Sequence, residues 1–354
     1  MLRWGIVGTG DISDRLVSDL LAIGGDISAV WGRTAERASD FATRHGIPTS
    51  TDDRAALFAR DDVDVVYIAT PAVTHMAITL EALDAGNHVL VEKPIATSAA
   101  DAEQLFARAA EANRFLMEAM WMRFNPLHVE VIDRIAAGEL GAIGNVRASF
   151  GTPFFPRPGK ERPEDGGSIL RDRGIYPVTL AHWFLGAPDV VQARGVLSEG
   201  VDLAGHATLE RADGAFAQLA WSGVDFLDLS AAISGERGWI TLDPMFWAGS
   251  DARVHAGSAE RIFREPEQLR HPRVGNGYGP MLEAVTAAIA SGLREHPWHD
   301  AATTISITRT LDRILADISS ESRCSRPDPP RRKPWTSQAR SSSSRAQETA
   351  SDAR

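Results

Sequence analysis

The chain has 354 residues, of which 44% are hydrophobic and 24% charged, and its formal net charge is −10. This composition is typical of a folded globular body, and the length exceeds what one hydrophobic core usually fills. The negative charge argues against nucleic acid as the main partner, because a nucleic-acid binder needs a basic surface that displaces counterions from phosphates.

The first third of the chain alternates between two kinds of pattern. Short apolar runs predict strands at residues 2–7, 27–31, 63–69, 89–91 and 115–117. Apolar residues at helical spacing predict helices at residues 11–23, 35–44, 75–85 and 98–112. This alternation predicts a doubly wound parallel sheet, an α/β Rossmann domain, which we assign to residues 1–122.

After about residue 140 the pattern changes to short strands separated by glycine turns. We expect strands at residues 145–150, 190–197, 206–210, 215–222, 229–234 and 239–242. Helical segments at 177–184 and 281–291 interrupt them, and a closing helix at 303–318 packs either here or back on the first domain. Residues 123–318 are therefore predicted to form an α+β domain with a mostly antiparallel sheet.

From residue 319 the composition shifts to serine, arginine and proline, with eight Lys/Arg against four Asp/Glu in residues 319–354. Low hydrophobicity of this kind predicts a disordered tail. A nucleic-acid or membrane arm and a frame-shifted end of the gene are the alternatives. We favour a solvated appendage, because short charged runs usually have that role.

Cysteine content and apolar runs bear on the compartment. The single cysteine, Cys324, cannot form a disulfide framework within the chain or a cysteine zinc site, as suits a reducing cytoplasm. No apolar run reaches the ~18 residues of a membrane span, and the first residues lack an export-signal pattern. We expect a cytoplasmic protein without membrane contact.

The segment Gly8-Thr9-Gly10-Asp11-Ile12 directly follows the first predicted strand and opens the first helix. Gly8 permits a tight turn, and Gly10 lets the backbone approach a pyrophosphate at the N-terminus of the helix. An ordinary strand-to-helix turn is the alternative. Its position after a strand and before a helix favours a dinucleotide site.

The end of the second predicted strand bears on the choice between NAD and NADP. An acidic residue there would bind the ribose 2′-hydroxyl of NAD, but this strand is followed by Arg33, Thr34 and, one helical turn later, Arg37. The guanidinium group suits a 2′-phosphate, and the threonine hydroxyl adds a hydrogen bond. NADP is favoured and NAD remains an alternative, as does a simple pairing of these arginines with neighbouring carboxylates.

Several polar residues follow strands at the carboxyl edge of the predicted parallel sheet, where ligands bind in open α/β folds. They are Thr70, Pro71, His75 and the motif Glu92-Lys93-Pro94. A lysine in a cleft can donate to a substrate oxygen and lower the pKa of a neighbouring phenol by its charge. The alternatives are a structural role for His75 and a surface position for Lys93. The Lys93–Pro94 bond could be cis, because a bond before proline permits it.

A glycine-rich segment later in the chain, residues 166–176, ends in Tyr176. A free tyrosine is a poor base at neutral pH, so the hypothesis requires Lys93 to lower its pKa. Asp172 lies four residues earlier, on the same face if the segment is helical, and either binds substrate hydroxyls or caps the helix. His182 fits no metal-ligand spacing and is expected to be structural.

Gly8-x-Gly10, Glu92-Lys93-Pro94 and Gly166-Gly167 through Asp172-x-Gly174-x-Tyr176 resemble the glucose–fructose oxidoreductase/inositol dehydrogenase (Gfo/Idh/MocA) family over about residues 2–318. Residues 118–126 and Tyr176 are similar to its dihydrodiol dehydrogenase and D-xylose dehydrogenase branch. The resemblance implies a Rossmann domain with an open-faced sheet domain, Lys93 and Tyr176 as the catalytic pair, and a homodimer through the open sheet face. Arg173 departs from the family, which commonly has an apolar residue there.

The function predicted from these residues is hydride transfer between a nicotinamide cofactor and a sugar or polyol hydroxyl or carbonyl, with proton transfer at Tyr176. Trp121 and Arg123 are expected to line the cofactor or sugar pocket; packing and a surface ion pair are the respective alternatives. Motifs of hydrolases, phosphoryl transferases and zinc enzymes are absent from the sequence, and we expect no metal. A dihydrodiol dehydrogenase, a reductase of dicarbonyl sugars and a cofactor-binding regulator remain as rivals.

Overall fold

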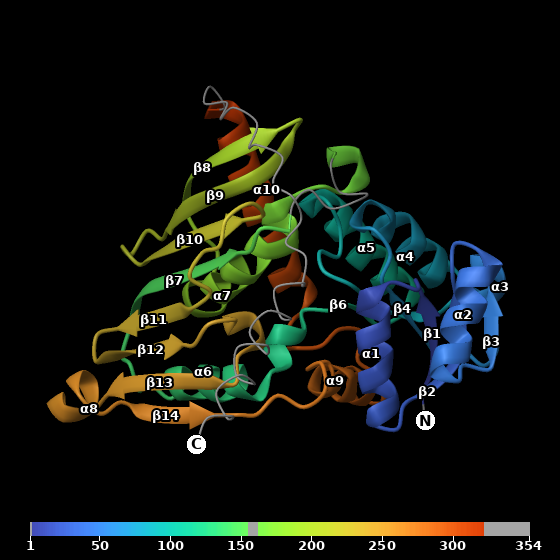
Figure 1. Cartoon of the computed structure of the whole chain (residues 1–354), viewed down its shortest axis with the longest axis horizontal. Helices are drawn as coiled ribbons and strands as arrows, with labels where there is room; N and C mark the ends of the chain where they lie inside the picture. Colours follow the sequence, from blue (N-terminus) through green and yellow to red (C-terminus); the bar gives the residue numbers. More distant parts are fainter. Residues whose placement is uncertain (1, 155–161, 322–354) are drawn as a thin grey trace, which may run out of the picture.

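The computed structural model describes residues 2–154 and 162–321. Figure 1 shows two sheets side by side, with the first part of the chain forming one and the later part forming the other. The predicted tail from residue 322 onward lies outside the described residues. The closing helix continues three residues further than predicted, to Glu321.

The first sheet is parallel and has the strand order β3-β2-β1-β4-β5-β6. Its strands are β1 (Arg3–Val7), β2 (Asp26–Trp31), β3 (Thr49–Thr51), β4 (Val65–Ile68), β5 (His88–Val91) and β6 (Leu116–Glu118). The connecting helices are α1 (Asp11–Ala22), α2 (Ala35–His45), α3 (Arg54–Phe58), α4 (His75–Asp84) and α5 (Ala99–Ala112). This is the expected Rossmann topology, and Ser98 caps α5 by accepting the Asp101 amide at 3.1 Å.

Two apolar layers bury this sheet on both faces. One packs α1 and α2 against residues such as Trp4 and Ile6, and the other packs α3, α4 and α5 against Val7 and Val66. Because both faces are covered, the strands are continuous apolar runs rather than alternating ones. The carboxyl ends of the strands remain as the accessible edge at which polar side chains meet.

The second sheet has eight strands in the order β14-β13-β12-β11-β7-β10-β9-β8. They are β7 (Ile143–Gly151), β8 (Val190–Ser198), β9 (Val201–Glu210), β10 (Phe216–Ser222), β11 (Ala231–Gly235), β12 (Gly238–Leu242), β13 (Asp251–Ala256) and β14 (Glu267–Arg270). All neighbours are antiparallel except β7 and β10. The mostly antiparallel sheet is confirmed.

Helices cover one face of the second sheet. They are α6 (Pro126–Ala136), α7 (Ile175–Leu185) and α10 (Ala301–Glu321), whose apolar residues share a core with the inward-facing residues of the strands. On β10, Ala217, Leu219 and Trp221 point into this core, whereas Phe216 and Gln218 point away and are exposed. Among the described residues, that outer face carries no helix, as expected for an open-faced sheet (Figure 1).

Two helices from the later part of the chain pack against the first part instead of only against the second sheet. The helix α9 (Gly279–Ala290), which we expected to interrupt the second sheet, buries Met281 and Leu282 in the same core as Trp4 and α1. The periodicity of α9 predicts a helix with an apolar face, but it does not tell which sheet that face packs against. Helix α10 packs against both α5 and α7, and Asp312 accepts the amide of Ala99 at 2.8 Å.

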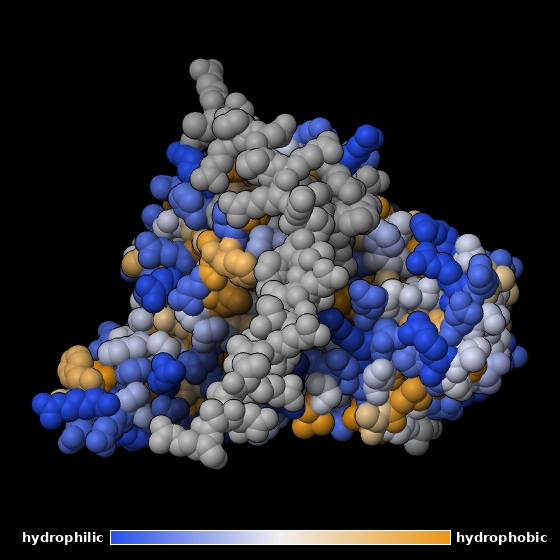
Figure 2. Space-filling model, viewed as in Figure 1, coloured by the Kyte–Doolittle hydropathy of each residue, from blue (hydrophilic) through white to orange (hydrophobic). Residues whose placement is uncertain are grey.

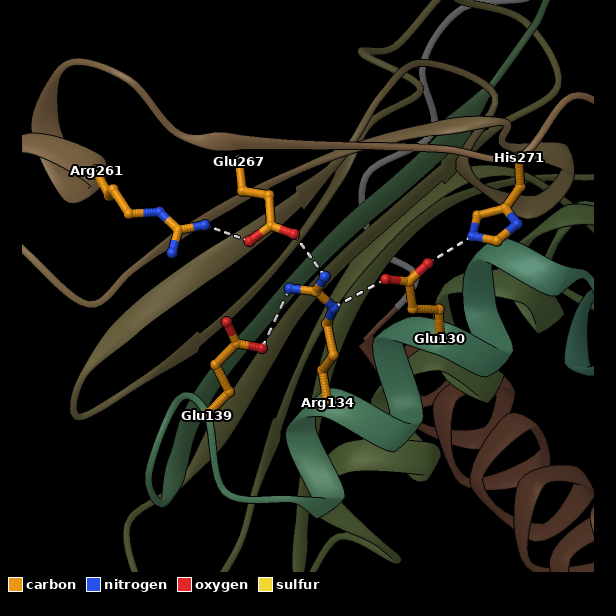
Figure 3. A network of polar contacts seen from close by, with 6 residues as sticks. All are labelled: Glu130, Arg134, Glu139, Arg261, Glu267 and His271. Carbon is orange, nitrogen blue, oxygen red and sulfur yellow. Dashed lines mark hydrogen bonds and ion pairs between the residues drawn. The ribbon is translucent and has the colours of Figure 1, made fainter.

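An ion network fixes α6 to the edge of the second sheet (Figure 3). The Arg134 guanidinium pairs with Glu130 at 2.9 Å, with Glu139 at 3.5 Å and with Glu267 of β14 at 2.6 Å. His271 contacts the other carboxylate oxygen of Glu130 at 2.5 Å. The network orients α6, which follows directly on the segment that carries Trp121.

Six elements were not predicted: β3, α3, α6, β13, β14, and α8 (Ala259–Phe263). Four of them, the strands β3 and β14 of three and four residues and the five-residue helices α3 and α8, have too few apolar positions to show a period. Helix α6 begins at Pro126, with Asn125 as its cap. No helix among the described residues is long and apolar enough to span a membrane.

Candidate active site

The glycine turn between β1 and α1 has the shape that a dinucleotide requires. Gly8 has φ +120°, and a Cβ there would lie 2.5 Å from the carbonyl oxygen of Ala69, so no other residue fits. A Cβ at Gly10, by contrast, would meet no atom within 4 Å. The N-terminus of α1, with Asp11 in its first turn and Ile12 36% exposed, therefore faces open space that can admit a pyrophosphate.

The residues after β2 are accessible for a phosphate group. Arg33 and Arg37 are exposed, and neither forms an ion pair within the described part of the chain, which includes their neighbours Glu36 and Asp40. The Thr34 hydroxyl accepts the amide of Arg37 at 3.3 Å and caps α2, which leaves its own proton available as a donor. These three residues and the glycine turn fit a dinucleotide with a 2′-phosphate.

Two loops at the carboxyl edge are connected through His75. Its ring is buried, with Nδ1 at 2.8 Å from the carbonyl oxygen of Pro94 and Nε2 at 2.9 Å from that of Thr70. The Thr74 hydroxyl donates to the Pro71 carbonyl at 2.7 Å, and its oxygen lies 2.7 Å from the Thr70 hydroxyl, which can donate to it. His75 thus joins the loop after β4 to the loop after β5, and the Lys93–Pro94 bond is cis.

Lys93, two residues after β5, has a side chain that is only 13% exposed and that contacts the later part of the chain, so the surface alternative is wrong. Its Nζ donates to the carbonyl oxygen of Asp172 at 2.6 Å and lies 3.2 Å from the Asp172 carboxylate. The same Nζ lies 5.0 Å from the centre of the Tyr176 ring. Burial works against the ammonium, but Tyr176, Asp172 and Glu92 outweigh it and the pKa of Lys93 is raised, so the group is cationic.

Asp172 and Tyr176 reach this lysine because the chain before α7 is wound as a π-helix, Leu170–Gly174. Asp172 lies inside that turn and caps no helix, so the capping alternative is wrong and its carboxylate instead orients Lys93. The Tyr176 phenol oxygen accepts the indole N–H of Trp121 at 3.2 Å. Lys93, Trp121, Asp172 and Tyr176 are brought together from three separate parts of the chain.

The expectation that Lys93 lowers the pKa of Tyr176 is wrong as a net effect. Burial raises the pKa of the phenol, and the positive charge of Lys93 and the Trp121 hydrogen bond only partly oppose this, so the pKa stays above its ordinary value. The buried ring loses hydration that would stabilise a phenolate. At neutral pH Tyr176 is therefore a protonated donor in this structure, not a base.

All three tyrosines of the chain gather around Glu92. The Tyr67 hydroxyl donates to the buried Glu92 carboxylate at 2.7 Å, and the Tyr278 ring lies 5.4 Å from that of Trp121. Burial raises the pKa of Glu92 to about 7, although Lys93 opposes the rise. Glu92 thus titrates near neutral pH beside the lysine of the same motif.

Aromatic rings form the wall next to Tyr176. Phe150 at the end of β7 stacks on Trp247 with ring centres 3.6 Å apart, and Tyr176 lies 5.8 and 6.2 Å from these two rings. The Arg173 guanidinium lies over Phe150 and donates to the carbonyl oxygens of Thr152 and Ser222. Phe150 and Trp247 are only half-buried, so an incoming ring can stack on them.

Arg123 does not join this group. Its guanidinium lies 4.9 Å from the Trp298 ring and 5.6 Å from the Trp183 ring, and burial lowers its pKa. Within the described part of the chain it forms no ion pair, because the side chain turns toward these two indoles. His182 is structural as expected: it contacts the Thr310 hydroxyl at 3.0 Å, and burial lowers its pKa to about 4.

The sequence reasoning missed Tyr67, Phe150, Asp202, Trp247 and Tyr278. A signal existed for two of them: Tyr67 is a phenol inside a buried apolar strand, and Asp202 is a lone carboxylate between Val201 and Leu203. The other three come from loops and strand ends whose meeting depends on tertiary packing. Among the described residues, no group of three His, Cys, Asp or Glu is placed to hold a metal ion.

Comparison with known protein families agrees with this geometry. Residues 2–120 match the model of the oxidoreductase family with an NAD-binding Rossmann fold, and residues 128–241 match the Gfo/Idh/MocA C-terminal domain. Together these matches cover more than half of the chain.

Individual relatives are similar over almost their whole length. The chain is 33% identical to trans-1,2-dihydrobenzene-1,2-diol dehydrogenase of Xenopus laevis, covering 89% of this chain and 98% of the relative. The human enzyme of that name is 31% identical, with 91% and 96% covered.

Solved structures similar to this fold include two oxidoreductases. One is a 3-ketoreductase from Actinomadura kijaniata in complex with NADP and TDP-benzene, with a TM-score of 0.78, 29% identity, and 89% and 97% of the chains covered. The other is aldose-aldose oxidoreductase from Caulobacter crescentus. Its TM-score is 0.79 and its sequence identity 25%, and the match covers 90% of this chain and 98% of that one. A Rossmann turn, an open-faced second sheet and these matches agree, and the chain belongs to the Gfo/Idh/MocA family of NAD(P)-binding oxidoreductases.

Proposed function

We propose that the chain is an NADP-dependent dehydrogenase/reductase that interconverts a hydroxyl and a carbonyl of a sugar or polyol. The observation that carries the proposal is the cluster in which Trp121 donates to the phenol of Tyr176, and Lys93, held by Asp172, lies 5.0 Å from the Tyr176 ring. A hydroxyl or carbonyl placed at this phenol would find a proton carrier with a fixed cation next to it.

In the reducing direction, a bound nicotinamide supplies the hydride. Tyr176 then donates its proton to the substrate oxygen as the carbonyl becomes an alcohol, and Lys93 stabilises the phenolate that remains. The raised pKa of the phenol keeps this proton in place at neutral pH. Oxidation requires Tyr176 to lose its proton first, so the structure favours carbonyl reduction near neutral pH.

NADP rather than NAD is proposed from Arg33, Thr34 and Arg37, which lie exposed after β2 without a carboxylate at the strand end. Crystals of the related 3-ketoreductase contain NADP, which agrees with this proposal. The guanidinium of Arg33 would pair with the 2′-phosphate, and the Thr34 hydroxyl would donate to it.

A trans-dihydrodiol dehydrogenase is the second candidate. The aromatic wall of Phe150 and Trp247 next to Tyr176 suits a flat, partly unsaturated ring, and the Xenopus and human relatives carry that activity in their names. A dicarbonyl-sugar reductase and an NADP-binding regulator also remain. The regulator needs neither Lys93 nor Tyr176, and the chain has both.

We also propose a homodimer through the outer face of the second sheet, on the resemblance to the family. This face has no helical cover among the described residues. Figure 2 shows apolar and polar residues mixed over its visible part, as over the rest of the visible surface, so the resemblance carries this proposal.

The test combines cofactor titration with a substrate screen. NADP and NAD are titrated into the purified protein, and D-xylose, D-glucose, myo-inositol, trans-dihydrodiols and dicarbonyl sugars are assayed at the reduced-nicotinamide absorbance. Turnover with NADP that Lys93→Met and Tyr176→Phe both abolish would establish the activity. Tight NADP binding without turnover of any of these compounds would support the regulator instead.

A further inference from the structure

Asp202, near the start of β9, is a buried carboxylate outside the group that surrounds Tyr176. Its side chain is 1% exposed and accepts three hydrogen bonds. The Ser168 hydroxyl donates at 2.7 Å, the amide of Leu170 at 2.6 Å and the indole N–H of Trp221 at 3.0 Å. Two of the three donors belong to the segment that leads to Asp172 and Tyr176.

These bonds act at the start of the π-helix, whose N-cap residue, Ile169, has no side chain that could accept an amide. The Ser168 oxygen that donates to Asp202 also accepts the amide of Arg171 at 3.1 Å. Asp202 therefore fixes two of the first amides of the turn, one directly and one through Ser168. A carboxylate from a different strand does here what a local capping residue does at other helices.

Trp221 makes the second contact between Asp202 and the turn. Its indole lies against Gly174, where an added Cβ would be 3.3 Å from the ring. The hydrogen bond to Asp202 holds the indole in that position, at the C-terminal end of the same turn. Asp202 thus holds the start of the turn at Leu170, and Trp221, which is bonded to Asp202, contacts its end at Gly174.

The charged groups around Asp202 are engaged elsewhere. Arg171 pairs with Asp312 at 2.9 Å, Asp172 with Lys93, and Arg173 donates to backbone carbonyls. On β8, Arg194 lies 3.8 Å from Asp317. The three donors to Asp202 are uncharged, and burial raises its pKa to about 6.

We propose that Asp202 is a positioning residue, whose ionised carboxylate holds the 168–176 segment so that Asp172 and Tyr176 meet Lys93. This inference rests on the proposed function and assigns no contact with substrate to Asp202. Small displacements of acid/base groups reduce rates strongly, so loss of the bonds to Asp202 should act on kcat more than on cofactor binding.

Two substitutions separate the bonds from the charge. Asp202→Leu has a similar shape but leaves all three donors without an acceptor, and we expect kcat to fall about 100-fold. Asp202→Asn keeps a neutral acceptor for the two N–H groups, so we expect a loss of about tenfold. The dissociation constant for NADP should stay within about threefold of wild type in both, because the dinucleotide turn lies in the other sheet.

Asp317→Leu is the matched control. Its carboxylate also accepts a backbone amide, that of Ala193 at 2.6 Å, but it holds β8 and not the active segment. We expect its kcat to equal that of the wild type. If Asp202→Leu does not fold, two milder variants remain: Trp221→Phe removes one bond to Asp202, and Ser168→Ala removes the bond to Asp202 together with the acceptor of the Arg171 amide. Each should lower kcat severalfold.

The pH dependence provides a readout that a merely structural role would not change. In the wild type, kcat should fall on the acid side with a midpoint near the pKa of Asp202, and this limb should be absent in Asp202→Asn. The indole N–H resonance of Trp221, identified by its loss in Trp221→Phe, should titrate at the same midpoint in the wild type only.

Folded Asp202→Leu with wild-type kcat, or an acid limb and an indole titration unchanged in Asp202→Asn, would overturn the inference. An inactive wild type would instead refute the proposed function. In that case the indole resonance still decides whether the carboxylate of Asp202 holds the segment.

Discussion

Replacement of Tyr176 by phenylalanine tests the central proposal with the smallest change in shape. The ring keeps its contacts with Phe150 and Trp247, at 5.8 and 6.2 Å between centres, so the aromatic wall is retained. Only the hydroxyl is lost, and with it the proton that the reaction needs. Positioned acid/base groups contribute about 10²–10⁴-fold to a rate, or roughly 3–5 kcal/mol in activation free energy.

The same substitution has a separate effect on stability. The buried indole N–H of Trp121, which donates to the phenol at 3.2 Å, would lose its acceptor. An unsatisfied buried donor costs about 1–3 kcal/mol, so the free energy of unfolding should decrease by roughly that amount. Denaturant unfolding measures this decrease independently of activity.

The assay measures kcat in both directions together with the dissociation constant for NADP. We expect kcat to fall at least 100-fold while NADP affinity is unchanged, since the phenol is not part of the dinucleotide turn. Lys93→Met should cause a comparable loss of kcat. A Tyr176→Phe variant with more than about a tenth of wild-type kcat would refute the assignment of the phenol as proton carrier.

The other predictions concern the cofactor, the pH dependence and the assembly. Arg33→Ala should raise the dissociation constant for NADP about 10- to 100-fold and leave that for NAD nearly unchanged; equal effects on both would remove the basis for NADP preference. Because the pKa of Tyr176 is raised, carbonyl reduction should persist through neutral pH and alcohol oxidation should accelerate into alkaline pH; rate profiles that coincide would contradict this. Glu92 has a folded-state pKa of about 7, so its ionisation reduces stability progressively as pH rises from about 4.5 to 7. Glu92→Gln should therefore match wild type near pH 4 and be up to about 3 kcal/mol more stable above pH 7. A stability difference between the two proteins that does not vary with pH would contradict this prediction. Ala220→Arg, on the outer face of β10, should shift the protein from dimer to monomer in sedimentation, whereas Leu21→Arg, at a 41% exposed position of α1 outside that sheet, should not; two monomeric or two dimeric variants would argue against that interface.

The local pattern of the sequence determined the first sheet and the dinucleotide turn. Continuous apolar runs, each followed by a helical period, specify strands buried on both faces, and Gly8 is required by a backbone angle that other residues rarely adopt. These features depend on neighbours within about ten residues. They could therefore be predicted from the sequence, before the tertiary structure was known.

The candidate site could be predicted only in part. Lys93 and Tyr176 were identified from motifs and from the resemblance, and the fold places them 5.0 Å apart, from the lysine Nζ to the centre of the tyrosine ring. The direction of the Tyr176 pKa was predicted wrongly, because desolvation depends on the number of buried atoms around the phenol, which no motif contains. The surroundings of Arg123 were not predicted either, since two indoles from distant segments determine where its side chain lies.

What the tertiary structure alone decided is how distant segments meet. The clustering of all three tyrosines about Glu92 and the support that Asp202 gives to the 168–176 segment both join residues far apart in sequence. So does the packing of α9 on the first sheet. The sequence by itself determined the elements and the chemical groups available, because those follow from local periodicity and side-chain type. Distances between the groups, and hence their protonation, follow from the packing of the two sheets, which only the folded chain specifies.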